Sequence, residues 1–245
     1  MDLATLKSEL NNHFVQLRNN IYLDKELNNK TIYRYTSFLN LIEILEGRFT
    51  LFPRCSFSDK HEIGDYSSEY INICYKNIID KKRREYYSKI KENFIQSTSF
   101  NVSCWTYETI ERYLMWKAYK GHSITVRIKT DINSLINSIR NIEYTIYCAP
   151  MSYEAETNNV KMYDIMFKKT LEYQDEKEIR IYAIKENNAP VPQPITLEIN
   201  PQVFVKEIYF SPFIGCENVK NLAEILKSKY HFTQDRLNYS NLIEY

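Results

Sequence analysis

Two carboxylates and a guanidinium recur at every second position in the stretch from Tyr173 to Tyr182. If this stretch is a strand, the apolar residues from Ile179 onward take one face, and Glu176, Glu178 and Arg180 line up on the other. Such a row can hold the hydroxyls of a sugar and stabilise the positive charge that develops at an anomeric carbon. The competing interpretation of the same pattern is a solvated, charged strand face.

A second candidate segment joins a short strand to a helix between Ile32 and Gly47. Ser37 can cap this helix, and Gly47 can end it in the left-handed conformation. An arginine at the end of a strand, just ahead of a helix N-terminus, is well placed to bind a phosphate. A strand, a cap and a core helix explain the apolar residues of the segment, but they do not explain Arg34 between two tyrosines.

Aromatic residues gather in a third segment, which contains both tryptophans, Trp105 and Trp116. Tyr113 and Trp116 share one face of a predicted helix. An aromatic stripe at this spacing is typical of a core helix. It can also form the wall of a site for a flat, ring-shaped ligand, and we keep both interpretations.

Composition excludes several classes of protein. The 245 residues are 44% hydrophobic and carry a net charge of +1, which gives no overall electrostatic footprint for nucleic acid or membrane. The local basic run from Lys76 to Lys91 fits a solvated helix face and leaves nucleic acid open. The five cysteines and four histidines have no metal-ligand spacing, and the four glycines form no phosphate loop. We therefore expect a cytoplasmic protein without a metal.

The secondary-structure signals are mixed strands and helices without regular alternation. They predict an α+β fold of a single domain over residues 1–245, with mixed central β-sheets and flanking helices. Leu3, Leu6, Leu10, Phe14, Leu17 and Ile21 recur at helical spacing, so we expect an amphipathic N-terminal helix over residues 1–22 as an appendage.

Five motifs occur in an order that resembles a bacterial domain-of-unknown-function family, number 2971. The opening strand and helix also look like those of ADP-ribosyltransferase toxins that modify DNA, and Glu176-x-Glu178 is similar to the glutamate motif of ADP-ribosyltransferases. The resemblance covers roughly residues 31 to 215. Its motifs are Tyr33–Ser37, Phe57–Glu62, Ser103–Trp105, Met115–Tyr119 and Tyr173–Arg180.

The resemblance implies an ADP-ribosyltransferase-like fold and NAD as the substrate, with cleavage of the bond between nicotinamide and ribose. Glu178 would bond the ribose 2′-hydroxyl and stabilise the oxocarbenium-like transition state. Glu176 would orient the acceptor or act as its general base. Arg180 would pair with a glutamate and set its geometry. The implied NAD-binding residues are Arg34, Tyr35, Thr36 and Ser37 around the phosphates, and Tyr113 or Trp116 against nicotinamide.

Bacterial transferases of this kind often serve as toxins or antiviral effectors, so the resemblance implies a macromolecular acceptor, with protein, RNA and DNA all open. A toxin also implies an antitoxin or regulatory protein as partner. Two alternatives share the motifs: an NAD glycohydrolase, which uses water as acceptor, and a non-catalytic binding or sensor module. The module becomes the better interpretation if Glu178 is buried in a salt bridge with Arg180 and no open cleft lies beside it. A further alternative, after the transferase, the glycohydrolase and the binding module, is magnesium-dependent nuclease chemistry at Asp59, Glu62, Asp175 and Glu178.

Overall fold

The computed structural model describes residues 8, 10–56, 100–121, 124–140, 142–153, 162–169, 171–185 and 193–242. The chain divides into two compact units. Unit 1 comprises Met1–Leu27, Thr50–Cys104 and Ile142–Ile195, and unit 2 comprises Asn28–Phe49, Trp105–Asn141 and Thr196–Tyr245. No helix among the described residues is long and apolar enough to cross a membrane.

The strands that lie wholly in unit 1 follow the order β1-β2-β7-β8. β1 is antiparallel to β2, β2 is parallel to β7, and β7 is antiparallel to β8 with Thr145 opposite Ile184. Both faces of β8 are covered, because every one of its residues is buried. The elements are β1 Phe14–Arg18, β2 Ile21–Asp24, η1 Lys25–Leu27, η2 Arg54–Ser56, β7 Thr145–Pro150, α7 Met162–Phe167, η4 Leu171–Glu176 and β8 Glu178–Ile184.

Aromatic rings dominate the core of unit 1. The Phe14 ring packs edge-on against Tyr147 at 5.1 Å between centroids, and Phe167 packs edge-on against Tyr182 at 5.3 Å. Leu10, Val102 and Met166 fill the space around these rings. Burial of this apolar surface is the main force that holds the sheet of unit 1 to α7.

The helix expected over residues 1–22 is wrong from Phe14 onward. Phe14–Arg18 and Ile21–Asp24 are the two strands of a hairpin, and Asn20 takes the left-handed conformation of its turn with φ of 60°. The segment is also no appendage, because Leu10, Phe14 and Ile21 are buried. Apolar residues three or four apart suit a helix, but the neighbouring strand β7 offers backbone partners that override the local preference.

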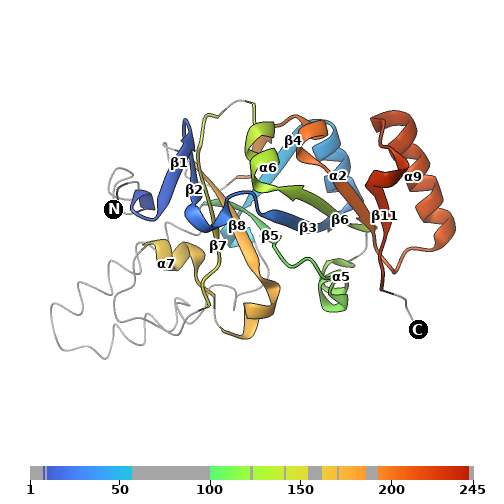
Figure 1. Cartoon of the computed structure of the whole chain (residues 1–245), viewed down its shortest axis with the longest axis horizontal. Helices are drawn as coiled ribbons and strands as arrows, with labels where there is room; N and C mark the ends of the chain where they lie inside the picture. The colour runs from blue at the N-terminus through green and yellow to red at the C-terminus, as the bar shows by residue number, and fades with distance from the viewer. Residues whose placement is uncertain are drawn as a thin grey trace. The chain divides into compact units, whose positions relative to one another are not determined.

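Unit 2 contains the strand order β3-β6-β10-β11. β3 is antiparallel to β6 over its full length, β6 is antiparallel to β10, and β10 is parallel to β11. Figure 1 shows α9 beside β11. The elements are β3 Thr31–Ser37, α2 Phe38–Leu45, α5 Tyr113–Tyr119, β6 Thr125–Asp131, α6 Ile132–Ser138, α8 Pro201–Phe204, β10 Glu207–Phe210, α9 Cys216–Tyr230, η5 Gln234–Arg236 and β11 Leu237–Tyr239.

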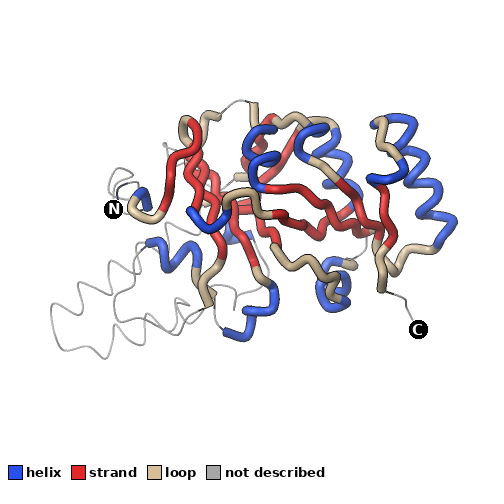
Figure 2. Tube along the Cα trace, in the orientation of Figure 1, coloured by secondary structure: helices blue, strands red, loops and turns tan. Residues whose placement is uncertain are grey.

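Three further strands have residues in the ranges of both units. They are β4 Arg48–Pro53, β5 Asn101–Thr106 and β9 Ile195–Glu198. Figure 2 shows strands and helices mixed along the described chain. Parallel and antiparallel pairs occur together, so the predicted α+β class with a mixed sheet and flanking helices is confirmed. That the chain forms a single domain stays a prediction.

The cap and the glycine predicted for the helix after β3 are confirmed, and a second capped helix, α6, follows β6. Ser37 is the N-cap of α2, and its Oγ accepts the Asn40 N–H at 3.1 Å. Gly47 follows α2 with φ of 84°, the left-handed conformation that glycine adopts without strain. Asp131 caps α6 by accepting the Ser134 N–H at 2.8 Å. Each of the two caps accepts a hydrogen bond from a helix N–H. Ser37 and Asp131 therefore fix where strands β3 and β6 end and the helices after them begin.

Candidate functional site

Glu178 opens β8, and two cations hold its carboxylate. The Arg180 Nε donates a hydrogen bond to Oε1 at 2.7 Å, and the Lys169 Nζ lies 2.7 Å from Oε2. All three side chains are buried, with exposed fractions of 4% for Glu178, 0% for Arg180 and 2% for Lys169. The carboxylate is therefore fixed in direction and shielded from water.

The charged state of Glu178 follows from these contacts. Burial alone raises the pKa of a carboxyl group, because it disfavours the charged form. The Arg180 guanidinium and then the Lys169 ammonium outweigh burial, and they lower the pKa of Glu178 to about 2. Glu178 is ionised at any physiological pH.

Glu176 lies beside Glu178 by a route that the sequence does not predict. It is the last residue of the 3-10 helix η4, and Lys177 after it has a left-handed backbone with φ of 44°. β8 begins only at Glu178, so the predicted row of Glu176, Glu178 and Arg180 along one strand is wrong for Glu176. Instead, Lys169 joins the two carboxylates, because its Nζ also lies 2.7 Å from Glu176 Oε2. The Glu176 side chain is 33% exposed.

The pairing predicted for Arg180 is confirmed. Its guanidinium bonds Glu178, and its Nη1 lies 3.4 Å from the Tyr182 hydroxyl, which in turn donates to the Met166 carbonyl at 3.0 Å. The backbone N–H of Glu178 donates to the Tyr153 hydroxyl at 2.8 Å. Glu178, Arg180 and Tyr182 are all buried, so this network lies in the interior of unit 1.

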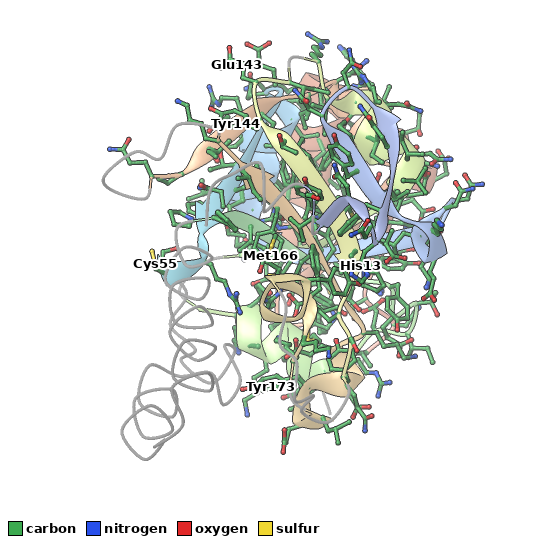
Figure 3. The ribbon with its side chains drawn as sticks, turned by 90° about the vertical axis from the view of Figure 1, so that its left-hand side faces the viewer. His13, Cys55, Glu143, Tyr144, Met166 and Tyr173 are labelled. Atoms are coloured by element: carbon green, nitrogen blue, oxygen red, sulfur yellow. The ribbon has the colours of Figure 1, made fainter. Side chains whose placement is uncertain are left out.

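Lys169 also contacts an aromatic ring near the site. Its Nζ lies 4.6 Å from the ring centroid of Tyr173, a residue of η4 that Figure 3 labels. An ammonium over a ring face is attracted by the ring quadrupole. Two carboxylates and one ring therefore converge on a single buried ammonium.

Arg34 lies in unit 2, where it is half-buried on β3. Its guanidinium carbon is 5.5 Å from the ring centroid of Phe49 and 5.9 Å from that of Trp105. The two hydroxyls that follow serve the N-terminus of α2: Ser37 caps it, and Thr36 Oγ1 accepts from the Asn40 side-chain amide at 3.0 Å. Roles for Arg34, Thr36 and Ser37 in NAD binding stay predictions.

The aromatic residues of α5 divide into a buried and an exposed group. Trp116 is fully buried, packs edge-on against Tyr35 at 4.8 Å, and donates its Nε1–H to Glu111 at 3.0 Å. These contacts favour the core interpretation of Trp116. Tyr113 is 47% exposed and packs against Phe213 at 5.5 Å, so of the two residues it is the one with ring surface accessible to a ligand.

Arg127 and Lys169 are among the buried cations that were not predicted from the sequence. Arg127 of β6 lies 3.7 Å from the ring centroid of Tyr33 and donates to the Glu108 carbonyl at 2.6 Å. Its place between Val126 and Ile128 puts it on the strand face opposite those residues, a signal that was available. Lys169 had no such signal, because a lysine after Lys168 at the end of a helix is typical of a solvated surface.

The predicted motif Phe57–Glu62 and the basic run Lys76–Lys91 lie outside the described residues. Asp59 and Glu62 of the magnesium alternative are among them. Within the described residues, no group of three or more His, Cys, Asp and Glu side chains is placed to hold a metal ion.

No protein-family model matches the chain, and no curated protein matches it. Two solved structures of DarT from Thermus sp. 2.9 are similar to it, one in complex with ADP-ribosylated single-stranded DNA and one in complex with NAD+. Each is 11% identical with a TM-score of 0.38, and the alignments cover 86% of this chain and 94% and 96% of the DarT chains. A likeness of this size carries no argument about activity, and membership of family 2971 stays a prediction.

Proposed function

We propose that the chain is an NAD-dependent ADP-ribosyltransferase with Glu178 and Glu176 as its catalytic carboxylates. The observation that carries the proposal is the pair itself. One carboxylate is ionised and fixed by Arg180, and a second, partly exposed carboxylate is joined to it through Lys169. The order of the sequence motifs supports the same assignment.

In the proposed reaction, the bond between the ribose C1′ and the nicotinamide nitrogen breaks, and its electron pair leaves with nicotinamide. Glu178 accepts a hydrogen bond from the ribose 2′-hydroxyl and stabilises the oxocarbenium-like transition state. Glu176, which reaches solvent, takes the proton of the acceptor as the new bond to C1′ forms. Arg180 keeps the Glu178 carboxylate ionised and in one orientation.

For NAD binding, we propose Arg34 for the phosphates, with Tyr35, Thr36 and Ser37 around it and Tyr113 or Trp116 against nicotinamide. Arg34 is the group with the right charge, since a guanidinium matches phosphate oxygens in two parallel bonds. Tyr113 is favoured over Trp116 because its ring is exposed.

The acceptor that we propose is a macromolecule, RNA, DNA or protein, and the biological role is that of a cytoplasmic toxin or antiviral effector held in check by an antitoxin or regulatory protein. An NAD glycohydrolase would use the same carboxylates with water as the acceptor.

A non-catalytic binding or sensor module is the second candidate, and one observation favours it. Glu178 is buried and paired with Arg180, which is one of the two conditions stated for this alternative. A carboxylate neutralised by two cations stabilises a developing positive charge less than a free one does.

Label transfer from NAD distinguishes these functions. Purified protein is incubated with NAD labelled in both the nicotinamide and the adenosine parts, alone and with total protein, RNA or DNA. Adenosine label on one polymer establishes a transferase and names its acceptor class. Release of nicotinamide without transfer of label identifies a glycohydrolase. If no mixture shows nicotinamide release or label transfer, the binding module is favoured. The Asp175→Asn variant, altered at an exposed carboxylate next to Glu176, is the matched control.

A further inference from the structure

Hydrogen-bond donors already occupy the Glu178 carboxylate. An ionised carboxylate has about four acceptor positions. The Arg180 Nε takes one on Oε1 at 2.7 Å, and Lys169 Nζ and Arg180 Nη2 lie 2.7 Å and 3.5 Å from Oε2. The Cys104 thiol adds a further hydrogen bond. A sugar hydroxyl can therefore bond Glu178 only after one of these donors leaves.

Lys169 is the strong donor that can leave at the lowest cost. Arg180 is fully buried, bonds Glu178 through two of its nitrogens and lies against Tyr182 through the third, so its departure would break three contacts in the interior. The Lys169 ammonium has three donors and a second carboxylate partner, Glu176, at 2.7 Å. After it leaves Glu178, the ammonium keeps that ion pair, and Glu178 keeps its pair with Arg180.

We infer that Lys169 occupies the substrate-hydroxyl position on Glu178 and sets the affinity of the site for NAD, with Glu176 retaining the ammonium when the ribose hydroxyl displaces it. This inference rests on the proposed function. Lys169 is here a positioning residue that competes with the substrate for one carboxylate oxygen. Glu176 consequently has a role in binding as well as in the chemistry.

The test is the dissociation constant of NAD, measured by calorimetry on the full chain. Lys169→Met removes the competing ammonium and leaves the Glu178–Arg180 pair intact. We expect about tenfold tighter NAD binding, the size of one charge-assisted hydrogen bond. Lys168→Met removes the neighbouring charge, and we expect it to leave the constant unchanged.

The NAD dissociation constant of Glu176→Gln is a second test, and it does not depend on whether Lys169→Met folds. This variant removes the carboxylate that retains the displaced ammonium, so Lys169 should hold Glu178 more firmly and NAD should bind about tenfold more weakly. Wild-type affinity in folded Lys169→Met or in Glu176→Gln overturns the inference and leaves the proposed function standing. A wild-type protein that binds no NAD overturns both.

Discussion

Replacing Glu178 with glutamine removes the carboxylate that Arg180 and Lys169 share, and we expect the fold to lose stability. Because the Glu178 side chain is buried, its loss affects the fold as well as the proposed chemistry. Arg180 is fully buried. Without Glu178, Arg180 loses its 2.7 Å ion pair and keeps the Tyr182 hydroxyl at 3.4 Å, while Lys169 keeps Glu176.

The size of the effect follows from the burial of the pair. Breaking a buried ion pair by removing one partner costs about 3–5 kcal/mol, because the other charge stays behind without compensation. A protein of ordinary stability unfolds with about 5–15 kcal/mol, so the loss is a large part of the total. For a chain of this length, it corresponds to a fall in Tm of about 10 °C.

Urea unfolding followed by circular dichroism measures the change. Glu176→Gln is the matched control, because it alters a carboxylate on the same lysine that is 33% exposed, and it should cost no more than about 1 kcal/mol. A triple variant, Glu178→Leu with Arg180→Met and Lys169→Met, replaces the cluster by apolar groups and should be far less destabilised than Glu178→Gln.

An unfolding midpoint for Glu178→Gln equal to that of the wild type would refute the reasoning. It would mean that Arg180 reaches water or another acceptor in the native state. If the triple variant is as unstable as Glu178→Gln, the loss of stability comes from altered packing and not from the charge left at Arg180.

Three further outcomes are expected. Because the pKa of Glu178 is lowered to about 2, its stabilisation is complete above the ordinary glutamate pKa near 4.5 and is lost as the pH falls toward 2. Urea midpoints measured from pH 5 to pH 2 should therefore show the gap between wild type and Glu178→Gln closing, and a constant gap contradicts this. Arg34→Ala should raise the KM for NAD more than it lowers kcat, and unchanged NAD binding by calorimetry gives Arg34 a structural role only. Ser37→Ala removes the cap of α2 and should cost about 1 kcal/mol in urea unfolding, whereas Ser37→Gly should cost only a few tenths.

Local sequence patterns were sufficient to predict helix caps and helix ends, because each of these depends on one residue and its near neighbours. Ser37 and Asp131 cap helices because their oxygens reach helix N–H groups, and Gly47 supplies a positive φ. Such tasks involve neighbours three or four residues away, so spacing alone predicts them. The strand Thr31–Ser37 and the helix after it were predictable for this reason.

The candidate site depends on contacts between residues distant in sequence, and these were only partly predictable. Glu178 and Arg180 are close along one strand, and their pairing follows from alternation. Lys169 lies beside them because one short segment bonds both elements. Met151 N–H donates to the Glu178 carbonyl at the start of β8, and Ser152 N–H donates to the Phe167 carbonyl at the end of α7. Lys169 N–H in turn donates to the Ser152 carbonyl. The hairpin of β1 and β2 was mistaken for a helix because backbone pairing with β7 is not encoded in the spacing of apolar residues.

The most direct test of the central claim is the rate of nicotinamide release from NAD by folded wild type and folded Glu178→Gln, compared below the Tm of the variant. We expect release by the wild type, a rate at least about 100-fold lower for Glu178→Gln, and no change for the control Asp175→Asn. Equal rates for wild type and Glu178→Gln would contradict the catalytic role of Glu178. Absence of release by the wild type with every acceptor present would contradict the proposed activity itself.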